Sequence, residues 1–379
     1  MKKAKPGDVK KAGKFEMLRG RKVRGMRFGT YPYTVTRVRV MKSRLLRAED
    51  YLRMKKMGLN EMIRFLEESE YKREIDLLSK EYSGTELIEL ALNENLANVV
   101  NKLLRISLKK EVRMLIEFYS LKWILNNVKL VLRTRMNRLG EEDLKYGIIP
   151  IKPADYETCL KMYRGSESEL MEMVSGITGV ERERIEEYYR GNDLAGMENE
   201  IDRAFYTRVI ELKRKIKIRK TDPLRQFFDH LVYLVNIKNI IRFKREGIDE
   251  ERIREMVVME GEKKKDMLLE SIIRSEDLKA VFEKLKESEY RNLITPEVGE
   301  DVSKLESSVD RFLLLHASRL LHRRPLSVSP IFGYLLSKEI EVKNIRILVH
   351  SKAMKLGEKF VDSNLIIPEE SAFRVIKHA

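Results

Sequence analysis

Apolar residues recur at helical spacing through most of the chain, and one stretch carries them on every side. Asp222 and Pro223 give this stretch a capping side chain and a first-turn proline, and Gly247 follows it. The pattern predicts a helix of about 24 residues, some 36 Å long. Its apolar positions are Phe227, Phe228, Leu231, Val232, Leu234, Val235, Ile237, Ile240 and Ile241. A helix that is apolar all round must be covered by neighbours on several sides.

The same segment occurs three times in the sequence. In each copy an aromatic residue lies nine positions before an Asn or Glu, which is followed by a β-branched residue and a lysine. The aromatic anchors are Phe118, Phe227 and Phe332, the polar residues Asn127, Asn236 and Glu341, and the lysines Lys129, Lys238 and Lys343. The anchors are offset by 109 and 105 residues, so each repeat takes about a third of the chain. Such periodicity predicts an internally repeated architecture.

Residues that typically start and end helices support the same division. Ser329 and Pro330 resemble Asp222 and Pro223 as a helix start, and Gly140, Gly247 and Gly357 follow the three segments where left-handed helix ends are expected. A weaker repeat, Glu-Ser-Glu-Tyr, ends at Tyr71 and again at Tyr290. We therefore expect a flexible basic extension at 1–27 and three helical repeat domains at 28–150, 151–250 and 251–379.

Composition favours an all-α protein. Hydrophobic residues make up 43% and charged residues 36%, while Gly and Pro together number only 28 of 379. A single Cys159 excludes an internal disulfide framework and any multi-cysteine metal site. The most apolar segment, 123–132, is interrupted by Asn126, Asn127 and Lys129, so no run approaches the ~18 residues that span a bilayer. Residues 1–27 have no apolar core of a signal peptide, and we expect the protein inside the cell.

The charge of the chain is unevenly distributed. The formal net charge is +16, and residues 1–27 hold eleven basic and two acidic side chains, a net of +9. The rest of the chain carries a net charge of +7, and its acidic and basic residues are mixed along its whole length. This mixture favours solvated helix faces over a nucleic-acid groove. The extension itself would either rest on acidic lipid headgroups or be a solvated extension without function.

Motifs for catalysis or cofactor binding are missing. No phosphate loop and no G-x-G-x-x-G turn occurs, the five histidines form no metal-binding motif, and Cys159 has no histidine nearby in sequence. Paired carboxylates such as Glu339 and Glu341 are typical of any charged helix edge. We therefore predict no catalytic residue, no cofactor and no metal.

Two other sets of residues allow alternative interpretations. The repeated Lys129, Lys238 and Lys343 would either meet an acidic partner three times or extend from buried helices into solvent. Tyr31 and Tyr33, with arginines close behind, would either stack on bases or form an aromatic anchor that closes the first helical unit, and the second is favoured.

These residues resemble a known family. The motifs that carry the resemblance are Tyr31-x-Tyr33-x-x-x-Arg37-x-Arg39, Leu45-Leu46, Glu70-Tyr71 and, most specific, Pro330-x-x-x-Tyr334-Leu-Leu-x-Lys338-Glu339-x-Glu341-x-Lys343-Asn344-x-Arg346. Over about residues 30–365 the chain is similar to the C subunit of archaeal A-type and bacterial V-type ATP synthases, a family that includes the d subunit of vacuolar ATPases. The resemblance implies an all-helical, funnel-shaped protein of three homologous domains around a pseudo-threefold axis.

The resemblance also implies a function. Members of that family join the central shaft, with its D- and F-type subunits, to the ring of membrane rotor subunits, so that ATP synthesis or hydrolysis is linked to ion translocation. The expected protein is a non-catalytic rotor subunit, peripheral on the cytoplasmic face of the membrane, that touches the membrane through the ring. The alternative is a helical-repeat module that binds nucleic acid.

Overall fold

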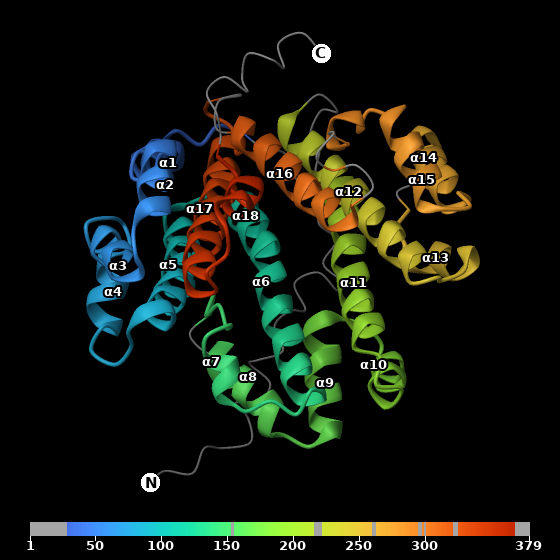
Figure 1. Cartoon of the computed structure of the whole chain (residues 1–379), viewed down its shortest axis with the longest axis horizontal. Coiled ribbons are helices and arrows are strands. Elements are labelled where there is room, and N and C mark those ends of the chain that lie inside the picture. Colours follow the sequence, from blue (N-terminus) through green and yellow to red (C-terminus); the bar gives the residue numbers. More distant parts are fainter. Residues whose placement is uncertain are drawn as a thin grey trace. The chain divides into compact units, whose positions relative to one another are not determined.

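The computed structural model describes residues 29–152, 155–215, 222–259, 263–294, 298, 301–320 and 325–367. Within these residues all regular structure is helical, with eighteen α-helices, one 3₁₀ helix and no strand (Figure 1). The all-α expectation is confirmed for this part of the chain. The basic extension at 1–27 lies outside the described residues.

The helices follow a recurring order of three short elements, two long helices and one short helix. After α1 (Pro32–Lys42), the first series is α2 (Ala48–Lys56), α3 (Leu59–Glu67), α4 (Lys72–Leu78), α5 (Gly84–Ile106), α6 (Lys110–Met136) and α7 (Glu142–Lys145). The second is α8 (Asp155–Arg164), α9 (Glu167–Thr178), α10 (Arg182–Arg190), α11 (Leu194–Lys215), α12 (Pro223–Arg245) and α13 (Glu250–Met256). The third is α14 (Lys263–Ile273), α15 (Leu278–Lys286), η3 (Arg291–Leu293), α16 (Val302–Leu320), α17 (Ser329–Ala353) and α18 (Glu358–Asn364).

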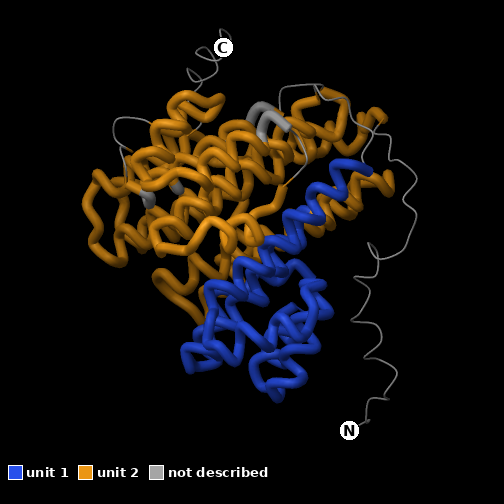
Figure 2. Tube along the Cα trace, turned by 90° about the vertical axis from the view of Figure 1, so that its right-hand side faces the viewer, with its two compact units in different colours: residues 1–27, 119–217 blue, residues 28–118, 218–379 orange. Residues whose placement is uncertain are grey.

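The chain forms two compact units, coloured in Figure 2. One contains the described part of 119–217, and the other contains the described parts of 28–118 and 218–379. In the larger unit α16 packs along both α12 and α17, and α17 also packs against α1 and α5. The three domains expected at 28–150, 151–250 and 251–379 stay a prediction.

The all-round apolar helix expected from the sequence is present as α12, 23 residues long. The Asp222 side chain accepts a hydrogen bond from the Leu224 N–H at 3.1 Å, so the predicted cap is correct. The cap predicted at Ser329 is wrong, because Ser329 is already the first residue of α17. The Ser327 hydroxyl instead accepts from the Ser329 N–H, at 3.2 Å.

The left-handed helix ends differ from the glycines expected there. Of Gly140, Gly247 and Gly357, only Gly247 has a positive φ, of 74°, and the corresponding residues after α6 and α17 are Arg138 at 55° and Lys355 at 53°. At each end the next N–H bonds back to a carbonyl five residues earlier, from Leu139 to Thr134, Ile248 to Phe243 and Leu356 to Ser351, at 2.8–2.9 Å. This bond closes a Schellman motif, which requires the left-handed residue whatever its side chain. Gly140 and Gly357 lie two residues too late to supply it.

The Glu-Ser-Glu-Tyr repeat has the same local geometry in both copies. Ser69 donates to the Leu66 carbonyl at 2.7 Å and accepts from the Tyr71 N–H at 3.3 Å. Ser288 makes the equivalent bonds at 2.8 and 3.0 Å. Both repeats thus use a serine to turn the chain and bury the tyrosine that follows, since Tyr71 and Tyr290 are both buried.

Candidate functional site

Three buried asparagines, one on each of the second long helices, hold the chain that follows. The Asn127 carboxamide donates to the Ile149 carbonyl and accepts from the Ile149 N–H, at 2.8 and 3.0 Å. Asn236 does the same with Val258 at 2.7 and 3.0 Å, and Asn344 with Ile366 at 2.9 and 2.9 Å. In every case the partner lies 22 residues later. We call each such pair an asparagine clasp.

Two residues after each clasp asparagine, a basic side chain reaches the first long helix of a neighbouring series. Lys129 bonds to Asp202 on α11, Lys238 bonds to Asp310 on α16 at 3.0 Å, and Arg346 on α17 bonds to Asn93 on α5. In each repeat the acceptor lies the same number of residues before the clasp asparagine: Asn93 before Asn127, Asp202 before Asn236 and Asp310 before Asn344. We call these contacts basic clasps.

A second contact extends two of the basic clasps by one helical turn. Arg133, four residues after Lys129, pairs with Glu198 through both carboxylate oxygens. His350, four residues after Arg346, lies 3.0 Å from Glu89, which Arg346 also contacts at 2.9 Å. Residues three to four apart share one helix face, so each helix is held along a line rather than at one point.

The clasps correct the alignment of the third repeat. The sequence match placed Glu341 and Lys343 with Asn127 and Lys129, whereas the contacts place Asn344 and Arg346 there. The tripeptides that begin at Glu341 and at Asn344 both consist of a polar, a β-branched and a basic residue. They lie three residues apart, so the sequence alone does not show which one is the third copy. With Asn344 as the third member, the two repeat offsets become nearly equal.

The three aromatic anchors are all buried, although one is out of register. Phe118, Phe227 and Phe332 are 6%, 3% and 1% exposed. Phe118 and Phe227 precede their clasp asparagine by nine positions, but Phe332 precedes Asn344 by twelve. The Phe227 and Phe332 rings lie edge to face with centroids 5.7 Å apart, which joins α12 to α17. Phe332 is thus a contact of this core rather than the third copy of the anchor.

The three repeated lysines all have carboxylate partners within the chain. Lys129 pairs with Asp202, while Lys238 and Lys343 both reach Asp310, from α12 and α17, each at 3.0 Å. Their positive charges lower the pKa of Asp310 below its ordinary value, against the opposing effect of its desolvation, which is the largest single cause. Asp310 therefore links three helices. A role of these lysines in binding a partner stays a prediction.

A buried charged cluster on α17 was missed in the sequence. Lys338 and Glu341, 1% and 2% exposed, form an ion pair at 2.6 Å. The Glu341 carboxylate also accepts from the Tyr71 hydroxyl at 2.8 Å and from the Leu46 N–H at 2.6 Å. The Lys338 ammonium lies 4.0 Å from the centre of the Tyr71 ring. Glu341, interpreted as part of an ordinary charged helix edge, in fact fixes α17 to the segments around α2 and α4.

Burial and the Glu341 charge raise the pKa of the tyrosines around this cluster. Desolvation is the main cause at Tyr51, Tyr71 and Tyr334, and the carboxylate of Glu341 adds to it at each. These hydroxyls stay protonated, and that of Tyr71 donates to the carboxylate. The buried carboxylate of Glu341 thus has three donors, as a buried charge requires.

Comparison with known proteins identifies the family of this fold. The family model described as ATP synthase (C/AC39) subunit matches residues 34–363. The chain belongs to the ATP synthase (C/AC39) subunit family. It is similar to proteins named as the C subunit of A-type ATP synthase from Methanosarcina acetivorans, 30% identical over 341 residues, and Methanosarcina mazei, 31% identical over 341 residues; each match covers 89% of this chain and 93% of the relative. The protein of the same name from Haloferax volcanii is 30% identical over 345 residues, which cover 88% of this chain and 97% of the relative.

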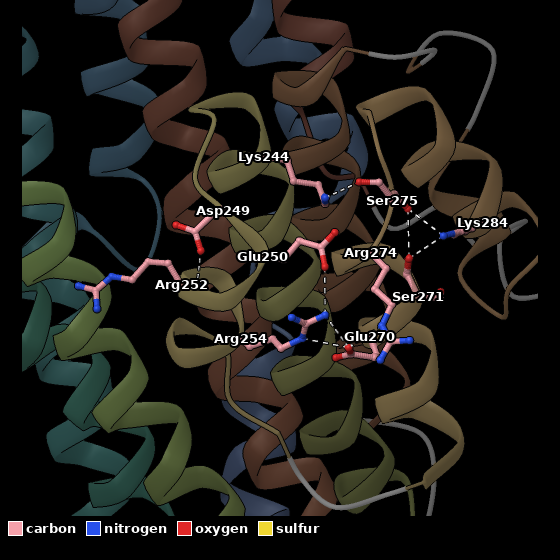
Figure 3. Close-up of polar contacts among 10 residues, drawn as sticks. All are labelled: Lys244, Asp249, Glu250, Arg252, Arg254, Glu270, Ser271, Arg274, Ser275 and Lys284. Atoms are coloured by element: carbon pink, nitrogen blue, oxygen red, sulfur yellow. Dashed lines mark hydrogen bonds and ion pairs between the residues drawn. The ribbon is translucent and has the colours of Figure 1, made fainter.

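Within this C/AC39 chain, the α13–α15 region contains its own polar network (Figure 3). Lys244 donates to the Ser275 carbonyl at 2.5 Å, and Lys284 donates to the Ser271 carbonyl at 2.6 Å. These carbonyls lie at the C-terminal end of α14, where positive charge is favourable. Burial is the main cause that lowers the pKa of Lys244, and the charge of Lys284 lowers it further. The lysine pair therefore attaches α12 and α15 to the end of α14.

The chemically reactive groups of this family member are few in the described residues. Cys159 is buried, and desolvation raises the pKa of its thiol to about 12, with Asp155 adding to the effect. Among the residues described, no three His, Cys, Asp or Glu side chains gather as metal ligands would. In the same part of the chain no helix combines the length and apolarity needed to cross a membrane.

Proposed function

We propose that this chain is a non-catalytic rotor subunit of an A/V-type ATP synthase, which couples the central shaft to the membrane rotor ring. The observation that carries the proposal is the family match over residues 34–363. The relatives named as the C subunit of A-type ATP synthase support it, because they align over 88–89% of this chain and over nearly all of their own length.

The clasps suit a part that transmits torque. A coupling must resist shear between its helices, and shear along a packed apolar surface is opposed only weakly by non-directional burial. Hydrogen bonds and ion pairs at fixed positions add directional resistance; a bond to a charged group contributes about 1.5–3 kcal/mol when buried and about 0.2–1 kcal/mol when exposed. Lys129, Lys238 and Arg346 supply such contacts at corresponding positions of three long helices.

The proposed partners are the D- and F-type subunits of the shaft and the ring of membrane rotor subunits. The chain would be peripheral on the cytoplasmic face of the membrane, with three homologous domains arranged about a pseudo-threefold axis. In this arrangement ATP is synthesised or hydrolysed elsewhere in the complex, so the chain itself needs no catalytic residue, cofactor or metal.

The proposal is tested by removing the chain from the complex. ATP hydrolysis and ion uptake would be measured side by side in vesicles that contain complete complexes or complexes depleted of this chain, with the purified chain added back as a control. We expect depletion to stop ion uptake, to leave hydrolysis by the soluble head, and to be reversed by add-back. Survival of ion uptake would refute the coupling role, and loss of hydrolysis by the head would indicate a catalytic or head-assembly role.

Co-purification supplies an independent test. Detergent-solubilised membranes should yield this chain together with ATPase subunits and the ring. Recovery of the chain free of these subunits and bound to nucleic acid would overturn the proposal in favour of a nucleic-acid module.

A further inference from the structure

The positive charge of the protein is concentrated at its start. Residues 1–48 hold sixteen basic and two acidic side chains, a net of +14 out of +16, so the rest of the chain carries only +2. The last part of this basic region is described by the structure as α1 and the turn after it. Residues 29–48 contain five basic and no acidic side chains.

One face of α1 is packed, and the other is exposed within the part of the chain that the structure describes. Thr34, Val35, Val38 and Met41 are buried, and the helix packs on α17 and α5. Tyr33 and Val40 stand 55% and 53% exposed, and Arg37 lies between them on the same helical stripe. Tyr33 was expected to be an anchor together with Tyr31; only Tyr31 is buried, and it is the residue that precedes the helix.

The turn after α5 also exposes apolar and basic groups. The Thr34 hydroxyl donates to the Ile106 carbonyl at 3.0 Å, which holds the end of α5 beside α1. The turn that follows exposes Leu108 by 73% and also exposes Lys109 and Lys110. An exposed leucine next to two lysines repeats the combination of apolar and basic groups seen on α1.

Acidic side chains bond to residues 31–47, while Glu49 at the start of α2 is exposed. Glu70 bonds to Arg44 at 2.8 Å, Asp50 accepts from the Arg47 N–H at 2.7 Å, and Glu111 accepts from the Tyr31 hydroxyl at 3.2 Å. No hydrogen bond or ion pair involves the side chains of Arg37 and Arg39 within the described residues, and both are exposed. Their charge is therefore available to an anionic partner.

We propose that the exposed face of α1, with the turn at 107–110, docks on the anionic headgroups of a lipid bilayer. Arginines and lysines attract acidic headgroups, while tyrosine and exposed aliphatic side chains suit the interface between headgroups and acyl chains. The preference for lipid over nucleic acid rests on the proposed function, which brings the protein to the membrane. Residues 1–27, with their net charge of +9, directly precede this surface in the sequence.

The test is vesicle flotation with the purified full chain. Vesicles of phosphatidylcholine alone would be compared with vesicles containing 30% phosphatidylglycerol, at low and high salt. The variant Arg37→Glu/Arg39→Glu is compared with the matched control Lys279→Glu/Arg291→Glu, which changes the net charge equally at exposed positions of α15 and η3. Circular dichroism checks that both fold, and Arg37→Gln/Arg39→Gln provides a milder second variant.

We expect binding to the anionic vesicles only, and weaker binding at high salt. A basic residue near an anionic surface strengthens partition about fivefold, so the α1 variant should bind at least about 30-fold more weakly and the control nearly as well as the wild type. Equal losses in both variants, or no loss in the α1 variant, would overturn the assignment of this face. Failure to bind anionic vesicles, or displacement from them by a single-stranded RNA at equal phosphate concentration, would overturn lipid as the partner. Because flotation uses the isolated chain, these outcomes are distinct from a failure of co-purification with the ATPase.

Discussion

Removing one member of the buried pair Lys338–Glu341 should destabilise the protein far more than removing both. In Lys338→Met the carboxylate of Glu341 stays buried and keeps only the Tyr71 hydroxyl and the Leu46 N–H as donors. In Glu341→Gln the ammonium of Lys338 stays buried over the Tyr71 ring without an opposite charge. Each single change should cost about 3–5 kcal/mol, the range found when a buried pair loses one partner.

The double variant Lys338→Met/Glu341→Gln should lie within about 1–2 kcal/mol of the wild type. No charge is then buried, and the glutamine amide can accept from the Leu46 N–H and donate to the Tyr71 oxygen. The coupling energy between the two positions is therefore expected to exceed about 4 kcal/mol. A pair of this kind adds little net stability but strongly favours one rotation of α17 against its neighbours.

The four proteins would be compared by urea unfolding, followed by circular dichroism. The surface pair Lys55–Asp362, at 2.7 Å, supplies the control, because Lys55→Met leaves its partner carboxylate in water and should change the unfolding midpoint far less. Additive losses, with the double variant about 6–10 kcal/mol below the wild type, would refute the idea that the cost comes from an uncompensated buried charge. Mild single variants would show that water reaches the cluster.

Four further predictions concern other contacts described above. Asn344→Ala should lower stability by about 2–4 kcal/mol in urea unfolding, since two buried groups of Ile366 lose their partner; an unchanged midpoint would contradict the clasp. Arg138→Gly should raise stability by about 1 kcal/mol and Gly247→Ala should lower it by about as much, because only glycine is unstrained at positive φ. A loss of stability in Arg138→Gly, or a gain in Gly247→Ala, would contradict backbone strain at these positions. Cys159 should resist an aromatic disulfide reagent at pH 8 and react fully once 119–217 unfolds, since burial raises its thiol pKa to about 12; rapid labelling of the native chain would refute its burial. Because the pKa of Asp310 is lowered in the folded protein, its contribution to stability is complete above the ordinary aspartate pKa of about 3.8 and is lost as the pH falls below that value. When unfolding is measured from pH 5 to 2, Asp310→Asn should therefore lose stability less steeply with falling pH than the wild type. An identical loss in the two proteins would contradict the assigned ion pairs.

The sequence was most informative where local chemistry decides the structure. Asp222, Pro223 and the apolar run after them specify α12 almost to the residue, because capping and burial both act within one helix. Helix ends were less predictable: Arg138 and Lys355 occupy left-handed positions that glycine would suit better, since the Schellman bond fixes the backbone and not the side chain.

The clasps and the charged cluster depend on partners distant in sequence. Asn344 and Glu341 are three residues apart on α17, yet one meets Ile366 and the other Tyr71, which lies 270 residues away. One sequence signal for the clasps was present: an apolar pair ends 22 residues after each asparagine, as in Val257–Val258. Nothing comparable in the local pattern marks Glu341 as buried.

The chemical differences among the basic clasps bear on how the chain avoids misfolding. Three similar pairs of consecutive long helices in one polypeptide invite exchange, in which a helix packs against the counterpart of its proper neighbour and forms a kinetic trap. Two repeats match lysine with aspartate, whereas Arg346 meets the uncharged Asn93 together with Glu89 one turn away. A pairing of α6 or α12 with α5 would place a lysine opposite the uncharged Asn93 and lose its ion pair with an aspartate, while Glu89 one turn away would still be available to a basic side chain. The unequal third clasp is thus expected to disfavour α6 or α12 in the place of α17 beside α5.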